Sequence, residues 1–246
     1  MNFAKYHVSY ADYIVSDDIG VERSARAVCD RHSGVGACGL VLVRENPFRA
    51  RFFRPDGREV PLDISAALCA GAYLGERSGS PKICMLTSAG VCETEIAPSG
   101  EMSAAIPYKK TGEMKVRHAD IGSGIEYIKS FFCGTTRAVC RVNDIYNAIL
   151  FGVGEKMSGY GAFGSGADVD FVRTLSRDKI EVRSYERGVG YITSGSGAFA
   201  AAKVLAELGE CGENVEIAVD CGKMRVSTGS DARLYAGVSK VMRGEI

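Results

Sequence analysis

The chain has 246 residues, 46% of them hydrophobic, and its 30 lysines and arginines balance its 30 aspartates and glutamates. This length and composition fit a globular protein of one large or two small domains. The balanced charge argues against a basic face for nonspecific nucleic-acid binding. We find no apolar run long enough to cross a bilayer and no amino-terminal signal pattern, so we expect a cytoplasmic protein with no membrane partner.

The nine cysteines and three histidines argue against both disulfides and a metal site. The cysteines are scattered, odd in number and set within apolar segments, which is typical of reduced core thiols in a cytoplasmic protein. The sequence has no Cys-x-x-Cys pair and no histidine cluster of the kind that binds zinc. We therefore expect no metal.

Turn signals and periodicity predict regular elements along the whole chain. Alanine-rich and leucine-rich stretches with few charges predict buried helices, and alternating stretches around an X-Gly turn predict strand pairs. In chain order, we expect a helix over 21–29, a helix over 65–74, two strands over 83–96, a glycine-rich loop or lid over 152–166, a helix over 196–208 and two strands over 215–226.

The elements after residue 185 repeat a pattern from the first half of the chain. Counting back by about the same number of residues from Gly90 and from Gly222, one in each strand pair, leads to Asp63 and Ser194. Both residues directly precede a predicted helix. The chain therefore reads as a divergent tandem duplication with two equivalent helix starts.

The helix start at Ser194 has the features of an anion site. Unpaired N–H groups and the positive end of the helix dipole favour a carboxylate or phosphate there, and Gly195 and Gly197 allow close approach to the backbone. The alternative is that Ser194 and Asp63 only cap their helices, which is the commonest role of such residues. The equivalence of the two starts favours a functional role.

Five motifs in order resemble the diaminopimelate epimerase family from end to end. They are Met1-Asn-Phe-Ala-Lys-Tyr-His7, Cys29-Asp-Arg-His-Ser-Gly-Val-Gly-Ala-Cys-Gly-Leu40, Phe53-Arg-Pro-Asp-Gly57, Glu186-Arg-Gly-Val-Gly190 and Gly244-Glu-Ile246. The resemblance implies an α/β (α+β) fold of two pseudo-symmetric domains, each a sheet wrapped around a central helix, with the active site between them at the two helix starts. It implies domains at 1–115 and 116–235, joined by the charged run Lys109–Lys115, with the tail 236–246 packing back onto the first.

The resemblance also implies proton transfer by two cysteines without pyridoxal phosphate, metal or other cofactor, and both cysteines are replaced here. The family's Cys-Gly-Asn-Gly motif corresponds to Asp63-Ile64-Ser65-Ala66, and its Cys-Gly-Thr-Gly motif to Ser194-Gly195-Ser196-Gly197. A serine without a neighbouring base is a poor base for an α-proton, whereas Asp63 can act as one. Cys38, which stands where the family has aspartate, is a candidate replacement thiol.

Several candidate site residues follow from the resemblance. Glu186 and Arg187 match residues that contact the distal amine and carboxylate of the substrate, while the family's substrate-binding asparagines are replaced. Arg54, at one of those asparagine positions, and Arg187 are suited to bidentate capture of a carboxylate, with surface ion pairs as the alternative. Glu59 matches an acid/base glutamate of the phenazine-biosynthesis isomerases. The expected catalytic residues are Asp63, Ser194 and Glu59, and the expected substrate-binding residues are Arg54, Ser65, Glu186, Arg187, Gly195 and Ser196.

Three functions remain open from the sequence. The first is an isomerase or epimerase acting by proton transfer on a small amino-acid-like or carboxylate substrate other than diaminopimelate. The second is a lyase or dehydratase that needs one strong base, and the third is a non-catalytic descendant that binds a ligand. We expect a small-molecule partner and no nucleic acid, and the resemblance allows a homodimer.

Overall fold

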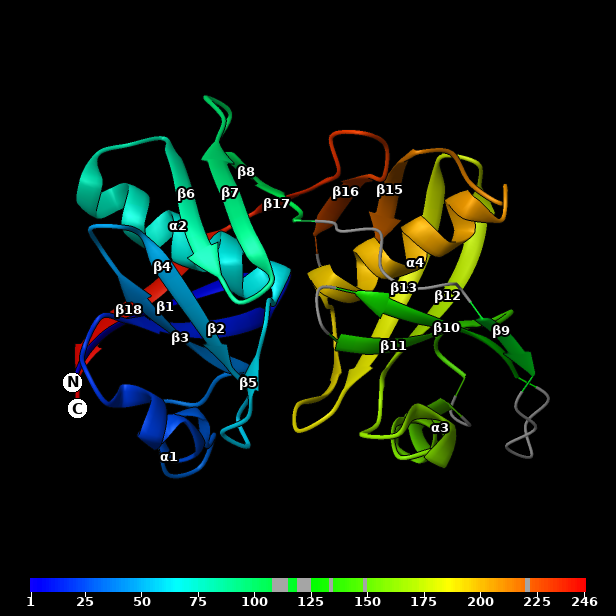
Figure 1. The fold of residues 1–246 in the computed structure, drawn as a ribbon, viewed down its shortest axis with the longest axis horizontal. Helices are drawn as coiled ribbons and strands as arrows, with labels where there is room; N and C mark the ends of the chain where they lie inside the picture. The colour runs from blue at the N-terminus through cyan, green and yellow to red at the C-terminus, as the bar shows by residue number, and fades with distance from the viewer. Residues whose placement is uncertain (108–114, 119–124, 133–134, 148–149, 220–221) are drawn as a thin grey trace. The chain divides into compact units, whose positions relative to one another are not determined.

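The computed structural model describes residues 1–107, 115–118, 125–132, 135–147, 150–219 and 222–246, in two compact units (Figure 1). The first unit contains Met1–Pro107 and Arg233–Ile246, and the second contains Tyr108–Ala232. The run Lys109–Lys115, the predicted join, lies outside the described residues except for Lys115. The final strand of the chain pairs with the first, so the C-terminal segment belongs to the first unit.

The first unit is a mixed sheet that encloses one long helix. Its strands pair in the order β18-β1-β2-β3-β4-β6-β7-β8-β17, with β5 added to β4. The elements are β1 (Asn2–Val8), β2 (Ala11–Ser16), the 3-10 helix η1 (Val21–Ser24), α1 (Ala25–Cys29), β3 (Gly39–Arg44), β4 (Arg49–Phe53), β5 (Glu59–Val60), α2 (Ile64–Ser78), β6 (Lys82–Thr87), β7 (Gly90–Ile96), β8 (Glu101–Ala105), β17 (Arg233–Gly237) and β18 (Ser239–Glu245).

The second unit is built in the same way around its own long helix. Its strands pair in the order β9-β10-β11-β12-β13-β15-β16, with β14 added to β13. The elements are β9 (Lys115–His118), β10 (Glu126–Phe132), β11 (Thr135–Arg141), α3 (Leu150–Ser158), the 3-10 helix η2 (Gly161–Phe163), β12 (Asp168–Ser176), β13 (Lys179–Glu186), β14 (Gly190–Ile192), α4 (Gly195–Glu207), β15 (Asn214–Ala218) and β16 (Lys223–Ser227).

The two units share one topology, which confirms the predicted duplication and fold class. In the first unit the strand pairs β1–β2, β2–β3, β3–β4, β4–β6 and β6–β7 are alternately antiparallel and parallel, beginning with an antiparallel pair. In the second unit the corresponding pairs β10–β11, β11–β12, β12–β13, β13–β15 and β15–β16 alternate in the same order. The predicted strand pairs over 83–96 and 215–226 are β6–β7 and β15–β16.

Helices α2 and α4 are buried because apolar and small residues cover most of their surfaces. Each has ten buried residues. α2 packs against strands that include β1, β2 and β6, α4 packs against strands that include β11, β12 and β13, and Figure 1 shows each helix lying along its strands. Glycines with positive φ follow both helices, at Gly79 and Gly209, as their C-terminal ends require.

Short helices pack on part of each sheet. In the first unit, α1 and η1 pack on a cluster that includes Val21, Val28 and Leu40. In the second unit, Val153 and Met157 of α3 lie in a cluster with Phe171 of the sheet.

The prediction of a glycine-rich loop or lid over 152–166 is wrong for its first half. Residues 150–158 form α3, followed by η2 at 161–163. Val153 and Met157, four residues apart, share one buried face, and this burial outweighs the low helix propensity of the glycines between and beside them. The expected helix over 21–29 is a 3-10 turn that continues into the five-residue α1.

A buried carboxylate in β2, Asp12, is held by basic side chains. Asp12 accepts hydrogen bonds from Arg31 at 2.6 Å and Cys38 N at 3.1 Å, and pairs with Lys5 at 2.9 Å. Burial acts to raise the pKa of Asp12, but hydrogen bonds from the side chains of Arg31, Lys5 and Cys38, together with the charge of Arg31, outweigh burial and lower the pKa to about 2.

Because the pKa of Asp12 is lower in the folded state, its stabilising contribution is present above the unfolded value and is lost as the pH falls towards 2. Since Arg31 is largely exposed, we expect this contribution to be about 1–2 kcal/mol. Urea unfolding at a series of pH values should show a gap between the protein and its Asp12→Asn variant that is largest at neutral pH and narrows below pH of about 4. A gap that is the same at neutral pH and near pH 2 would refute this assignment.

Candidate active site

Asp63 lies at the start of α2, as the sequence predicts. It is the N-cap residue, and its Oδ1 accepts the backbone N–H of Ala66 at 3.0 Å. The Tyr13 hydroxyl donates to the same carboxylate, 3.2 Å from each oxygen. Asp63 is only 6% exposed. The carboxylate is therefore fixed in direction by the helix and by a buried tyrosine of β2.

Ser194 occupies the same position at the start of α4. Its Oγ accepts the backbone N–H of Gly197 at 3.0 Å, which is the capping role. The same hydroxyl donates its own hydrogen to Glu186 Oε1 at 2.5 Å. Both side chains are buried, at 4% and 1% exposure. Ser194 therefore has the neighbouring carboxylate that the sequence did not reveal.

A buried arginine organises the acidic side chains around this start. The side chain of Arg137, from β11, is fully buried and makes two hydrogen bonds to Asp170, at 2.7 and 2.8 Å. Its contacts to Asp168, at 3.3 Å, and to Glu186, at 3.4 and 3.5 Å, are longer. Burial acts to lower the pKa of Arg137, but the three carboxylates raise it well above its usual value, so the guanidinium is charged. We call these four side chains the Arg137 cluster.

The first turn of α4 lies directly on the Arg137 cluster. A Cβ at Gly197 would lie 2.2 Å from Ser184 Oγ, 2.3 Å from Asp170 Oδ1 and 2.9 Å from Arg137 Nη2. Ser184 in turn donates to Asp170 at 2.6 Å. Glycine is therefore required at 197 by the close approach of helix and cluster.

Strand register identifies positions that the duplication makes equivalent. Tyr13 pairs with Gly39 across β2 and β3, and Arg137 pairs with Asp168 across β11 and β12, so Tyr13 and Arg137 occupy the same place in the two units. Each contacts its helix start, Tyr13 directly at Asp63 and Arg137 through the carboxylate of Glu186. No sequence motif singled out Arg137, although its place directly before the apolar residues Ala138, Val139 and Cys140 was a usable signal.

The same register relates Arg54 to Glu186. Phe53 pairs with Leu40 and Tyr185 pairs with Val169, and the next residues are Arg54 and Glu186. Arg54 is buried, at 6% exposure, at the start of a turn closed by Gly57 N–H donating to Arg54 O at 2.9 Å. This burial does not fit a surface ion pair, the alternative that the sequence left open for Arg54.

The remaining predicted residues lie at or near the two helix starts, with one exception. Ser65 is in the first turn of α2, and Gly195 and Ser196 are in the first turn of α4, all of them buried. Arg187 N–H donates to Asp168 at 3.0 Å, and its guanidinium donates to Ser165 O. Glu59 is exposed on β5, where it is held by Arg51 at 2.7 Å.

Two buried thiols of the first unit, Cys38 and Cys69, have raised pKa values. Burial and the charge of Asp12 raise the pKa of Cys38 to about 12. Burial and the charge of Asp63 raise the pKa of Cys69 well above its usual value. Since the thiolate is the reactive form, the raised pKa values disfavour Cys38 and Cys69 as replacements for the missing catalytic thiols.

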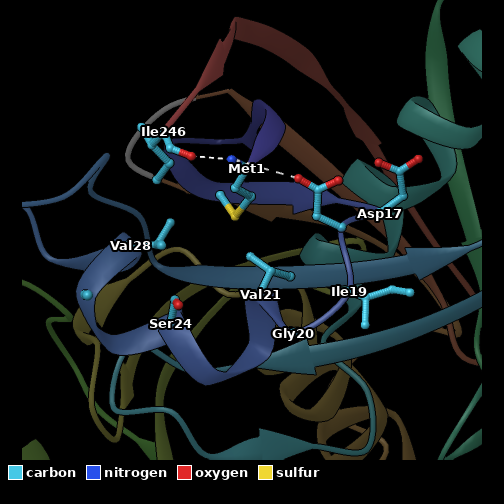
Figure 2. Close-up of a pocket in the computed structure, with 10 residues that line it drawn as sticks. Met1, Asp17, Ile19, Gly20, Val21, Ser24, Val28 and Ile246 are labelled. Carbon is cyan, nitrogen blue, oxygen red and sulfur yellow. Dashed lines mark hydrogen bonds and ion pairs between the residues drawn. The ribbon is translucent and has the colours of Figure 1, made fainter.

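A cavity of about 920 Å³ opens in the first unit, away from all the predicted site residues. Figure 2 shows its lining, which includes Asp17, Ile19 and Val21 from the segment before α1. Asp17 is paired with Arg77 at 3.2 Å, and Asp18 accepts Asn2 N–H at 2.7 Å. The acidic groups of this cavity are thus engaged within the unit.

Across the described residues, no three His, Cys, Asp or Glu side chains are grouped so that they could hold a metal ion. Within the same residues, no helix is long and apolar enough to span a bilayer.

The chain is similar to epimerases and racemases over its whole length, although no family model matches it. It is 30% identical to a diaminopimelate epimerase of Caldanaerobacter subterraneus, covering 100% of this chain and 99% of that protein. It is 31% identical to an O-ureido-serine racemase of Streptomyces lavendulae, covering 94% of this chain and 88% of that protein.

Two solved structures share the fold at low identity. One is a hydroxyproline epimerase from Agrobacterium vitis, with a TM-score of 0.76 and 12% identity, covering 100% of this chain and 90% of the other. The other is a predicted epimerase from Pseudomonas aeruginosa, with a TM-score of 0.71 and 15% identity, covering 100% of this chain and 98% of the other. With the shared topology of its two units, its paired helix starts and its full-length relatives, the chain belongs to the diaminopimelate epimerase family of isomerases.

Proposed function

We propose that the protein is a cofactor-independent amino-acid racemase or epimerase in which Ser194, Glu186 and Asp63 move the α-proton. The observation that supports this most strongly is the hydrogen bond from Ser194 Oγ to Glu186 Oε1 at 2.5 Å. A serine needs an adjacent base to accept a weakly acidic proton, and Glu186 is placed to be that base. The loss of the family's cysteine is thereby offset by a serine–glutamate pair.

The proposed step transfers two protons. The substrate's α-C–H bond breaks, its electron pair stays on the α-carbon, and the proton forms an O–H bond with Ser194 Oγ. At the same time the original Ser194 proton passes to Glu186. Arg137 lies 3.4–3.5 Å from Glu186, farther than Ser194 does, so the carboxylate oxygen is directed mainly at the hydroxyl. When the reaction runs in the opposite direction, the reverse of these two transfers returns a proton from Ser194 to the α-carbon.

Asp63 is our candidate for the second acid/base group, because an inverted product needs a proton from a group other than the one that removed it. Its carboxylate is buried and directed by Ala66 and Tyr13. Glu59 is the alternative in this unit, but its carboxylate is exposed and held by Arg51. We therefore place Asp63 ahead of Glu59.

We propose an α-amino acid other than diaminopimelate as the substrate. The first turns of α2 and α4, with Ser65, Gly195 and Ser196, are positive ends of helix dipoles and suit a carboxylate. Arg54 and Arg187 are the candidate guanidinium groups for substrate binding. A relative that is named an O-ureido-serine racemase favours a substrate whose side chain is uncharged.

The relatives favour an isomerase over the lyase and the non-catalytic binding protein, since the curated ones are named epimerases or a racemase. We also propose a cytoplasmic homodimer, which the scattered, odd number of cysteines in the sequence and the family resemblance support. Light scattering at twice the mass of one chain would support the dimer, and a monomer would refute it.

The proposed function is tested by chiral analysis of single enantiomers after incubation with the protein. L-serine, L-alanine and O-ureido-L-serine are suitable probes. We expect one of them to be converted to its D enantiomer, and Asp63→Asn to slow conversion by about 100-fold or more, the usual contribution of a general acid or base. Full activity of the Asp63→Asn variant would remove Asp63 from the mechanism, and an elimination product in place of a D enantiomer would favour a lyase.

A further inference from the structure

The starts of α2 and α4 each carry one hydroxyl and one carboxylate joined by a hydrogen bond. At the start of α4 the hydroxyl belongs to the N-cap residue Ser194, and its partner is the carboxylate of Glu186. At the start of α2 the order is reversed, because the N-cap residue Asp63 supplies the carboxylate and Tyr13 supplies the hydroxyl. All four residues are buried. A proton taken from a substrate would therefore be stored on a carboxylate at either start.

The Tyr13 side chain is fixed in position beside Asp63. Tyr13 is only 2% exposed, and its ring lies against Gly39 of β3, where a Cβ would come within 3.2 Å of a ring carbon. The hydroxyl lies at the same distance, 3.2 Å, from both oxygens of Asp63. It can therefore donate to whichever of the two oxygens carries the negative charge.

The two oxygens of Asp63 differ in their other contacts. Oδ1 also accepts the backbone N–H of Ala66 at 3.0 Å, which caps α2. Among the hydrogen bonds of the described residues, Oδ2 accepts from Tyr13 alone. Since a carboxylate oxygen has two lone pairs, Oδ2 keeps one of them for a proton. The bond to the helix thus makes Oδ2 the oxygen of Asp63 that is better suited to proton transfer.

We propose that Tyr13 is a positioning residue of the reaction, which holds Asp63 so that Oδ2 exchanges a proton with the α-carbon. This inference rests on the proposed function, in which Asp63 is the second acid/base group. In the return step, the electron pair on the α-carbon forms a C–H bond with the proton of Oδ2, and the electrons of the broken O–H bond stay on Asp63. Tyr13 keeps its own proton and donates a hydrogen bond to the new carboxylate, which is a stronger bond than one to the neutral acid.

Tyr13→Phe tests this role, because it removes one oxygen atom and keeps the ring that packs against Gly39. The probes are the single enantiomers of serine, alanine and O-ureido-serine. Racemisation uses Asp63 once in each direction. Conversion in both directions should therefore slow by about 10-fold to 100-fold, the effect of losing a hydrogen bond to a charged group. Chiral analysis measures both rates, and a melting curve shows that the variant is folded.

β-Chloroalanine, which is similar in size to serine, separates proton removal from proton return. When its α-proton is removed, the electron pair of the C–H bond forms a double bond to the β-carbon, and chloride leaves with the electrons of the C–Cl bond. For the enantiomer that loses its proton to Ser194, Tyr13→Phe should release chloride at close to the original rate, because no proton from Asp63 is needed. For the other enantiomer Asp63 is the base, so release should slow by about 10-fold to 100-fold.

Tyr6→Phe is the matched control. Tyr6 is a buried tyrosine of β1 whose hydroxyl donates to Glu76 at 3.1 Å, near the end of α2 that is opposite to Asp63. The variant removes the same atom from the same kind of bond in the same unit. Racemisation and chloride release should both continue at their original rates.

Unchanged racemisation by a folded Tyr13→Phe variant would overturn the role of Tyr13. An equal loss of chloride release from both enantiomers of β-chloroalanine would also overturn it, because a merely structural contact would affect both alike. Either result leaves the proposed function in place. The failure of the proposed function looks different: the unmodified protein would neither convert the probes nor release chloride, and the role of Tyr13 would fall with it.

Discussion

Replacement of Glu186 by glutamine is expected to slow α-proton exchange by about 100-fold to 10,000-fold, the range of a lost general base. The amide of Glu186→Gln can still accept the Ser194 hydrogen bond, but it cannot take the proton. The variant should remain folded because Arg137 keeps its two short hydrogen bonds to Asp170 and its contact to Asp168. The measurement is the rate of α-deuterium incorporation into the substrate in deuterated water.

Glu181→Gln is the matched control, with the same chemical change on the same strand, β13. Glu181 pairs with Arg173 at 2.6 Å and does not belong to the Arg137 cluster, so its replacement should leave the exchange rate unchanged. Adding Ser194→Cys to Glu186→Gln should restore part of the rate, because a thiol with a pKa of roughly 8.5 needs less help from a neighbouring base. Exchange at the original rate in Glu186→Gln alone would remove Glu186 from the reaction.

Gly197→Ala is expected to lower the free energy of unfolding by about 2–4 kcal/mol, the cost of overpacking combined with disturbance of a buried charge cluster. The new methyl group would lie within 3 Å of Ser184, Asp170 and Arg137. The gain of about 1 kcal/mol that alanine normally gives in a helix is too small to compensate. Chemical denaturation of the variant and the unmodified protein measures the difference.

Gly152→Ala provides the comparison for this substitution. Gly152 lies in the first turn of α3, and a Cβ there meets no atom within 4 Å. The change should be neutral or stabilising by up to about 1 kcal/mol. If Gly197→Ala were as stable as Gly152→Ala, the first turn of α4 could not lie on the Arg137 cluster as described.

The helix starts and strand pairs could be predicted from the sequence because their signals are local. Asp63 and Ser194 cap helices whose small apolar residues favour burial, and glycines mark the ends of those helices. The equal spacing to the X-Gly turns then revealed the duplication, which the strand pairings confirm. Such signals depend on neighbours within a few residues, and tertiary packing did not override them.

The Ser194–Glu186 contact could not be predicted, because it depends on how the chain folds back between the two residues. β13 ends at Glu186, and the three-residue β14 pairs with it before α4 begins. Because β14 runs antiparallel to β13, the chain reverses direction over a few residues and places Ser194 beside Glu186. The sequence therefore indicated a serine without a base, whereas the structure supplies one.

Arg137 was missed because a charge within a strand usually faces solvent. Its neighbours Ala138, Val139 and Cys140 are buried as well, so the strand is covered on both faces. Only the carboxylates of β12 and β13, distant in sequence, make burial of the guanidinium favourable. α3 was missed for a related reason. The glycines of this segment indicate a loop, and only the tertiary packing of Val153 and Met157 stabilises a helix there.

The proposed proton transfer by two separate groups is tested most directly by measuring which enantiomer contains α-deuterium early in a reaction run in deuterated water. Proton removal by the Ser194–Glu186 pair and return from Asp63 predict a product enantiomer that is almost fully α-deuterated while the remaining substrate enantiomer is still mostly protonated. Nuclear magnetic resonance of the separated enantiomers measures both. A product that retains the original proton, or exchange without inversion, would contradict transfer by two separate groups.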